Sequence, residues 1–309
     1  MKERDMIKLL CSGLPRAGTQ VNALFESDAE ILKFGDRYLL YSMDEFSEED
    51  LFAAKDPYCL GHNIACAAIS DIIASGGEPL YYAHSLTVDS RFDRRYTERF
   101  AKGIGDVLKE AKADLIGGDF GRAEHWRCCA AVIGITETPV LRSGARAGDH
   151  IYLTGPVGAG NMQAALGLYH VPFTGMIPAF TLRMNALEDI RKYATSCIDT
   201  SDGLFQSVNM LAKMSKTGYA ITDIPYVKGG RTLARLTGLP LLMLAFCECG
   251  EYELLFTSPE ELPYLKIGQI REQGMTINGK DVSRIDLSAR SHQDLKDYLK
   301  EAKTICEEL

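Results

Sequence analysis

Strand-like and helix-like segments alternate along the whole chain of 309 residues. The first forty residues are predicted to be rich in loops, and Asp56-Pro57 is predicted to begin a helix. The strand-like run 80–88 is followed by a helix-like segment at 94–113, a short strand-like run at 114–116 with a turn at 117–119, and a strand-like run at 127–136; in the second half a helix is predicted at 259–272. A turn-rich stretch at 143–149 interrupts the pattern, which then starts afresh. Such alternation is typical of an α/β or α+β fold, and the interruption predicts two domains, 1–139 and 140–309. A hydrophobic fraction of 46% supplies enough apolar side chains for two cores.

Charge and hydropathy narrow the classes of partner. The net charge is −8, from 42 acidic and 34 basic residues, and no dense block of Lys and Arg interrupts it. Nucleic acid is therefore not an expected partner. The longest apolar stretch after the N-terminal region, Leu239 to Phe246, is far too short to span a membrane. Nine cysteines without paired C-x-x-C spacing indicate reduced thiols, so we expect a cytoplasmic protein with no membrane partner.

Three glycine-rich patterns invite a nucleotide interpretation, and none is a complete phosphate-binding loop. The stretch Gly274–Lys280 begins like a P-loop, but Asp281 stands where Ser or Thr is required, and a β-turn at Asn278-Gly279 explains it better. The stretch Gly13–Gly18 lacks the lysine and predicts a mobile N-terminal loop. The stretch Gly155–Gly160 predicts a tight strand-to-helix turn, with at most a secondary binding role.

Aspartates at the ends of predicted elements offer another way to hold a nucleotide, through metal ions. Mg²⁺ is bound by carboxylates, phosphate oxygens and water. Five aspartates have suitable positions: Asp28, Asp44, Asp71, Asp119 and Asp202. Taken singly, each is equally explained as a helix cap or turn residue. If they converged, their repulsion would raise their pKa values, so convergence makes physical sense only around cations and a bound nucleotide.

Five segments, three of which contain one of these aspartates, occur in an order that resembles one family. They are Ala67–Leu80, Leu115–Asp119, Leu141–Asp149, Asp199–Leu204 and Tyr252–Phe256. Together the chain resembles the thiamine-monophosphate kinase family, of the superfamily shared with aminoimidazole ribonucleotide synthetase and selenophosphate synthetase. The likeness covers nearly the whole chain.

This resemblance implies a fold, an assembly and a reaction. Two α/β sandwich domains are expected, with the N-terminal domain pairing its sheet across a homodimer and ATP lying between the domains near the dimer interface. The reaction implied is transfer of the ATP γ-phosphate to a small-molecule phosphate acceptor, thiamine monophosphate, giving thiamine diphosphate. ATP and Mg²⁺ are required, and positioning and electrostatics supply the catalysis without a covalent intermediate.

The resemblance also assigns roles to individual residues. The expected metal ligands are Asp28, Asp44, Asp71, Asp119 and Asp202. The expected catalytic residues are Ser201 and Asp202. The expected nucleotide contacts are Gly117, Gly118, Asp119 and Arg142. The expected contacts to the acceptor are Glu48, Phe52, Glu251 and Tyr252.

The chain departs from the family pattern where the acceptor would bind. Ser27 replaces one of two adjacent aspartates, and Glu251 replaces an aspartate. The substrate loop, here Asp44–Phe52, loses its glycine and histidine, and Ser47 with Asp50 also fits a helix-capping pattern. Two alternatives therefore stay open: a related kinase or synthetase for another small metabolite, and a non-catalytic ATP-binding protein.

Two branches of the superfamily fit poorly. The hydrogenase-maturation branch ends in a cysteine tail, whereas this chain ends Ile305–Leu309. Selenophosphate synthetase would place a reactive cysteine near a lysine in a mobile N-terminus, and Cys11 lacks that neighbourhood.

Overall fold

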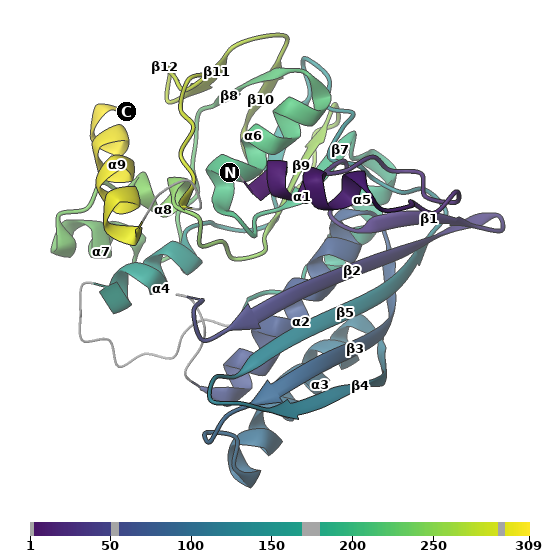
Figure 1. Ribbon diagram of the computed structural model, residues 1–309. Coiled ribbons are helices and arrows are strands. Elements are labelled where there is room, and N and C mark those ends of the chain that lie inside the picture. The colour runs from purple at the N-terminus through teal and green to yellow at the C-terminus, as the bar shows by residue number, and fades with distance from the viewer. Residues whose placement is uncertain (1–2, 51–55, 169–179, 290–293) are drawn as a thin grey trace.

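The computed structural model describes residues 3–50, 56–168, 180–289 and 294–309 (Figure 1). Phe52, expected to contact the acceptor, lies outside the described residues. Two β-sheets with flanking helices form a mixed α/β structure, which confirms the predicted fold class. Among the described residues, no helix is both long and apolar enough to cross a membrane.

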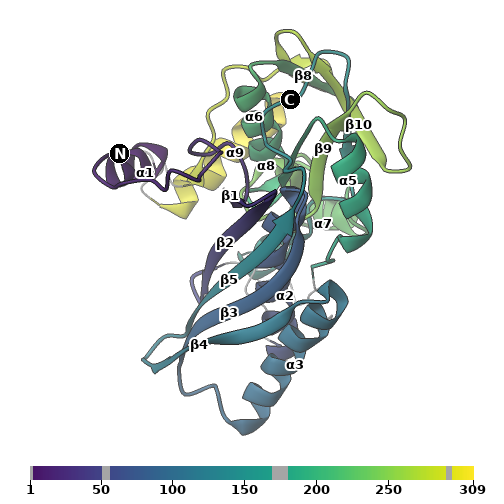
Figure 2. The same cartoon turned by 90° about the vertical axis from the view of Figure 1, so that its right-hand side faces the viewer.

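The first part of the chain forms a five-stranded sheet and three helices. These elements are α1 (Glu3–Ser12), β1 (Glu30–Phe34), β2 (Arg37–Ser47), α2 (Pro57–Ala74), β3 (Glu78–Val88), α3 (Arg94–Ala111), β4 (Asp114–Arg122) and β5 (Arg127–Thr136). The strand order is β1-β2-β5-β3-β4, in which only β3 and β4 pair in parallel. Helices α2 and α3 cover one face of the sheet, and Figure 2 shows no described helix over the other face.

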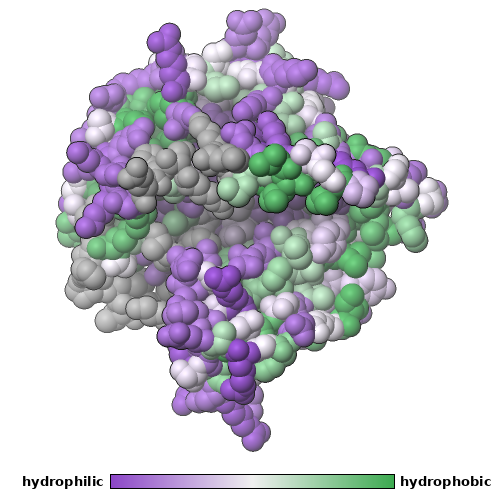
Figure 3. Space-filling view, in the orientation of Figure 1, coloured by the Kyte–Doolittle hydropathy of each residue, from purple (hydrophilic) through white to green (hydrophobic). Residues whose placement is uncertain are grey.

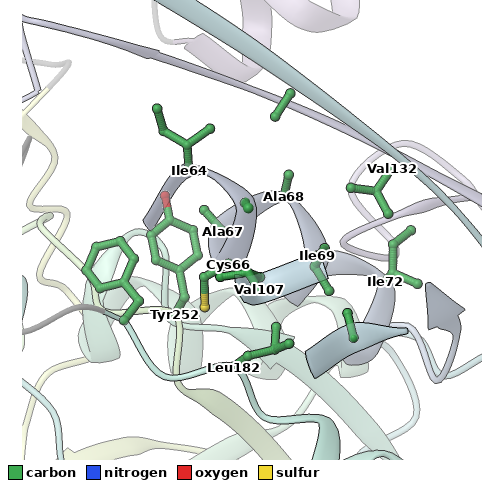
Figure 4. Close-up of a cluster of buried hydrophobic side chains, with 14 of the residues drawn as sticks. Ile64, Cys66, Ala67, Ala68, Ile69, Ile72, Val107, Val132, Leu182 and Tyr252 are labelled. Atoms are coloured by element: carbon green, nitrogen blue, oxygen red, sulfur yellow. The ribbon is translucent and has the colours of Figure 1, made fainter. Parts of the chain in front are cut away.

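Helix α2 is the central element of the N-terminal core. Asp56 caps it by accepting a hydrogen bond from the Cys59 backbone N–H at 3.1 Å, and Pro57 occupies its first turn. The helix is apolar on nearly all sides, because the sheet, α3 and the second half of the chain pack around it. Figure 4 shows Ile69 and Ile72 of α2 in one core with Leu182 and Tyr252 from that second half. Both halves of the chain therefore share this core.

The second part of the chain forms a seven-stranded sheet with helices. These elements are β6 (His150–Leu153), α4 (Ala159–Leu168), η1 (Met184–Ala186), α5 (Leu187–Tyr193), β7 (Ser196–Asp199), α6 (Gly203–Ser215), β8 (Gly218–Ile221), α7 (Gly230–Thr237), α8 (Met243–Phe246), β9 (Leu254–Ser258), β10 (Leu265–Arg271), β11 (Met275–Ile277), β12 (Lys280–Asp281) and α9 (Leu295–Glu308). The strand order is β12-β11-β8-β10-β6-β9-β7. The strands of the two sheets come from separate stretches of chain.

Several sequence-based expectations were wrong in detail. The loop-rich N-terminus contains helix α1, whose Arg4 guanidinium lies over the Phe25 ring. The segment 259–272, expected to be helical, contains strand β10 because it pairs with β6 and β8. Strand β4 continues well beyond its expected end, so the Gly117–Asp119 segment lies inside a strand rather than in a turn. The β-turn at Asn278-Gly279 is confirmed, because it joins β11 to β12 with positive φ at both residues.

Candidate active site

Three carboxylates from distant parts of the chain meet between the two sheets. Asp28 precedes β1, Asp71 lies near the end of α2, and Asp199 ends β7. Each offers an oxygen atom, and these oxygens all lie within 4.8 Å of one another. Unscreened carboxylates this close repel strongly, so the arrangement is one that a cation would stabilise.

Asp28 is held in this cluster by Arg142. The Arg142 Nε–H donates to Asp28 Oδ1 at 3.0 Å, and a second guanidinium N–H donates to the same oxygen. The other oxygen, Oδ2, is buried and has no hydrogen-bond partner among the described residues. Burial raises the pKa of Asp28 to about 7 despite the opposing charge of Arg142. One oxygen is therefore fixed by a cation while the second remains available.

Asp71 and Asp44 extend the cluster. The Ser42 hydroxyl donates to Asp71 Oδ2, linking α2 to β2. Burial, followed by the charges of Asp44 and Asp199, raises the pKa of Asp71 well above its ordinary value. Burial and neighbouring carboxylates, Asp199 first among them, likewise raise the pKa of Asp44 to about 7. Asp44 lies within β2 rather than at its end, because this strand continues to Ser47.

Asp199 is the site residue that our sequence interpretation missed. It is 1% exposed and accepts hydrogen bonds from the Ser70 hydroxyl and from Ser201, whose backbone N–H and hydroxyl lie 3.2 and 2.7 Å from Oδ1. A signal was available, because Asp199 follows the apolar pair Cys197-Ile198 at the end of a short strand. We assigned the chemistry of that segment to Ser201 and Asp202 instead.

Ser201 and Asp202 lie in the turn between β7 and α6. Ser201 uses its hydroxyl to orient Asp199, while Asp202 occupies the N-cap position of α6 and is exposed. The charge of Asp202 contributes to the raised pKa of Asp44, which places it beside the cluster. Gly250 permits the segment before β9 to approach this turn, since a Cβ there would lie 1.6 Å from the Thr200 carbonyl oxygen.

An apolar hollow of about 340 Å³ opens next to Asp202. Helices α4, α7, α8 and α9 supply its apolar walls, including Leu168, Leu233, Met243, Leu244, Tyr298 and Leu299. Four carboxylate side chains also line it: Glu49, Asp50, Asp202 and Glu248. The hollow can hold an apolar or aromatic group beside the carboxylate cluster.

The residues expected to contact the acceptor have diverse surroundings. Glu48 follows the end of β2 and pairs with Arg91 at 2.8 Å and with His125. Glu251 is buried against the start of α4, where its Oε2 accepts from the Gly158 N–H at 2.8 Å. The carboxylate of Glu251 therefore occupies the glycine-rich turn where a phosphate was considered. Tyr252 has a φ of 60° and packs between Phe46 and Phe180 near the cluster.

The expected nucleotide contacts on β4 lie apart from the carboxylates. Asp119 pairs with Ser85 of β3, and strands β3 and β5 separate β4 from β2, which carries Asp44. At the usual strand spacing the two backbones are roughly 14 Å apart. Asp119 is exposed, and Gly117 and Gly118 lie beside it on the same edge strand. Within one chain, the cluster therefore forms without Asp119.

Comparisons with known proteins show which proteins this chain is similar to. Residues 26–136 match the family model of the AIR synthase related protein, N-terminal domain. The chain is 29% identical over 272 residues to the thiamine-monophosphate kinase of Aquifex aeolicus, covering 82% of this chain and 89% of that relative. It is 27% identical over 314 residues to the thiamine-monophosphate kinase of Pyrococcus horikoshii, covering 97% of this chain and 98% of that relative.

Solved structures of similar fold include a thiamine-monophosphate kinase relative and a hydrogenase maturation protein. The structure of AaThiL complexed with AMPPCP and TMP superposes with a TM-score of 0.79 at 26% identity, over 91% of this chain and 94% of that one. The HypE-HypF complex shows the same fold at 16% identity, with a TM-score of 0.73, over 91% of this chain and 99% of that one. Residues 26–136 thus resemble the N-terminal domain of AIR synthase related proteins, and the fold resembles that of AaThiL. The resemblance recognised in the sequence is confirmed, and the two relatives named above, which are similar to this chain over most of their length, are thiamine-monophosphate kinases.

Proposed function

We propose that this protein is an ATP-dependent kinase that transfers the γ-phosphoryl group of ATP to thiamine monophosphate, giving thiamine diphosphate. The observation that carries the proposal is the cluster of Asp28, Asp71 and Asp199 between the two sheets. The names of the curated relatives and the neighbour complexed with AMPPCP and TMP support the choice of donor and acceptor.

The residues of the cluster fit Mg²⁺. All three are oxygen donors, and the buried Oδ2 of Asp28 has no hydrogen-bond partner among the described residues. Asp28, Asp71 and Asp199 would hold the ion, with Asp44 and Asp202 beside them. When bound, Mg²⁺ neutralises the charge on the phosphate oxygens during transfer.

The protein's own residues orient the cluster. Arg142 fixes Asp28, Ser42 fixes Asp71, and Ser70 with Ser201 fixes Asp199. Hydrogen-bonded supports of this kind determine which oxygen of each carboxylate faces the ligand. The side chains thus hold the phosphates for in-line attack by the acceptor. The roles of Gly117, Gly118 and Asp119 toward the nucleotide remain predictions.

The hollow beside Asp202 is the proposed place for the organic part of the acceptor. Its apolar walls suit the rings, and its four carboxylates suit a positively charged group. Glu48 and Glu251 have other partners, so among the described residues of the original acceptor set only Tyr252 keeps a place near the cluster.

We further propose a homodimer formed through the uncovered face of the five-stranded sheet. Met43, Tyr41 and Tyr81 are 60%, 37% and 44% exposed there. Tyr41 and Tyr81 both pair with Ile133 of the intervening strand, which makes one apolar row across three strands. Figure 3 shows hydrophobic side chains over this face and on α1, which projects from the same side in Figure 2. A second copy is the proposed occupant, because the neighbouring apolar side chains of α1 enlarge the surface to be covered.

Release of ADP tests the proposed reaction. The purified protein with Mg²⁺ and ATP is expected to release ADP when thiamine monophosphate is added. This release is expected to stop when EDTA removes the metal. Activity with another phosphorylated metabolite but not with thiamine monophosphate would support the assignment as a kinase and reject thiamine monophosphate as the acceptor. ATP binding without ADP release for any acceptor would reject the kinase.

A further inference from the structure

We propose that Arg91 is a positioning residue, which fixes the turn at residues 47–50 through Glu48 so that Glu49 and Asp50 face the acceptor hollow. The inference rests on the proposed function, because it concerns the site where the acceptor would bind. It assigns Glu48 a role different from the direct contact expected from the sequence.

The turn is compact and directly continues β2. The Ser47 backbone N–H donates to Asp50 Oδ2 at 2.7 Å, and the Glu49 N–H donates to the Ser47 hydroxyl at 3.2 Å. The side chains of the turn point to two different places. Glu49 and Asp50 line the hollow, whereas Glu48 reaches Arg91 and His125. Glu48 therefore links the turn that carries Glu49 and Asp50 to Arg91 and His125.

Arg91 is itself firmly held. Its Nε–H donates to Asp89 Oδ2 at 2.9 Å, and its backbone N–H donates to Asp89 Oδ1 at 2.8 Å. The Asp89 side chain is only 5% exposed, which gives the arginine a buried anchor. Arg91 Nη2 also donates to Asp89 Oδ2, and its contact with Glu48 Oε2 at 2.8 Å leads to the turn. His125 contacts the other oxygen of Glu48 from the loop between β4 and β5.

Three loops at one end of the sheet thus converge on Glu48. Isolated ion pairs at exposed positions contribute little, but a carboxylate contacted at both oxygens, at one of them by the anchored Arg91, has a defined orientation. If the turn is already ordered before the acceptor binds, less conformational entropy is lost on binding and the acceptor binds more tightly. The expected effect therefore falls on acceptor binding and spares Mg-ATP.

Cleavage by a Glu-specific protease tests the anchor without any substrate. The Arg91→Gln variant is expected to be cut after Glu49 about three-fold faster than the unaltered protein, because the turn opens more often. The matched control is Arg94→Gln, which removes an ion pair of the same 2.8 Å length, with Glu98 on α3, away from the turn. Equal cleavage of the unaltered protein and the Arg91→Gln variant would overturn the inference, whatever the acceptor proves to be.

Steady-state kinetics test the consequence. Arg91→Gln and Glu48→Gln are each expected to raise the KM for thiamine monophosphate about five-fold and to leave the KM for Mg-ATP within about two-fold, with the double variant no worse than either single one. Arg91→Lys should recover part of the loss. Equal changes in both KM values, or faster cleavage with an unchanged acceptor KM, would overturn the positioning role. Faster cleavage in a protein that does not use thiamine monophosphate would support the anchor and reject the proposed acceptor.

Discussion

Asp44 shows the electrostatic conflict of the site, because burial and then the neighbouring carboxylates raise its pKa to about 7 from an ordinary value of 3.8. A carboxyl whose pKa is higher in the folded state contributes stability that is fully present below pH 3.8 and lost as the pH rises through 7. The Mg-free protein therefore becomes less stable across this range. Metal binding would remove the penalty.

The variant Asp44→Asn tests this conflict. Without metal, it is expected to be roughly 1–2 kcal/mol more stable than the unaltered protein at pH 8, because a charge that is buried and repelled by neighbouring carboxylates has been removed. At pH 4 the two should have nearly the same stability. Urea unfolding at both pH values provides the measurement, and equal stabilities at pH 8 would contradict the account. Turnover should fall although stability rises.

Sequence reasoning found most, but not all, of the carboxylates that meet. Asp28, Asp44, Asp71 and Asp202 were identified because each stands near the end of an element in a family-like segment. Asp199 was missed, since the neighbouring Ser201-Asp202-Gly203 motif drew the assignment. Ser27 replaces an expected aspartate, but its hydroxyl donates to the Ala29 carbonyl and accepts from Asn22, so it has a role inside its own loop.

At the scale of elements, Glu251 and the start of α4 explain a glycine pattern that resembled a phosphate site. Burial raises the pKa of Glu251 to about 8 from an ordinary 4.5, while backbone N–H groups of Gly158, Gly160 and Ala159 oppose the rise. This group contributes stability below pH 4.5 that is lost as the pH rises through 8. The glutamate is therefore a structural cap for the helix.

Two substitutions separate this capping role from an acceptor contact. Glu251→Ala is expected to lower the free energy of unfolding by roughly 2 kcal/mol at pH 7, because buried N–H groups lose their acceptor. Glu251→Gln keeps an oxygen acceptor and should lose much less stability and show a smaller decline between pH 5 and 8. Thermal unfolding of both variants checks this expectation. A Glu251→Ala protein of unchanged stability but weaker acceptor binding would instead restore the role expected from the sequence.

Local patterns predicted elements well where short-range chemistry determines them. Asp56 with Pro57 correctly predicted the start of α2, and strand β5 was predicted with its observed bounds, Arg127–Thr136. Strand β10 was not predictable in this way, because only pairing with β6 and β8 makes that segment extended. Asp119 was likewise placed wrongly in a turn, because the length over which β4 pairs with β3 is not visible in the local sequence.

The whole molecule leaves an apolar sheet face and the apolar side chains of α1 exposed on one side. Met43 lies in the middle of that face, opposite Ala131, and a charge there would be buried by a partner. The variant Met43→Glu is therefore expected to weaken the proposed dimer by at least about 100-fold in Kd while the chain remains folded.

Light scattering after gel filtration measures this change. The exposed Leu236 on α7 offers a matched control, since Leu236→Glu places the same charge on a surface away from the sheet. A monomeric protein before any substitution would reject the dimer, and a dimer unaffected by Met43→Glu would reject this face as its interface.

The central claim is that the buried carboxylate cluster binds Mg-ATP, and Asp199 tests it most directly because it was found from the structure and lies deepest. Calorimetric titration with Mg-ATP, comparing the unaltered protein with Asp199→Asn at pH 7.5, is the measurement. We predict that the unaltered protein binds Mg-ATP, that EDTA abolishes binding, and that Asp199→Asn weakens it by about 10- to 100-fold with unchanged folding. Equal affinity of the two proteins for Mg-ATP would contradict the account.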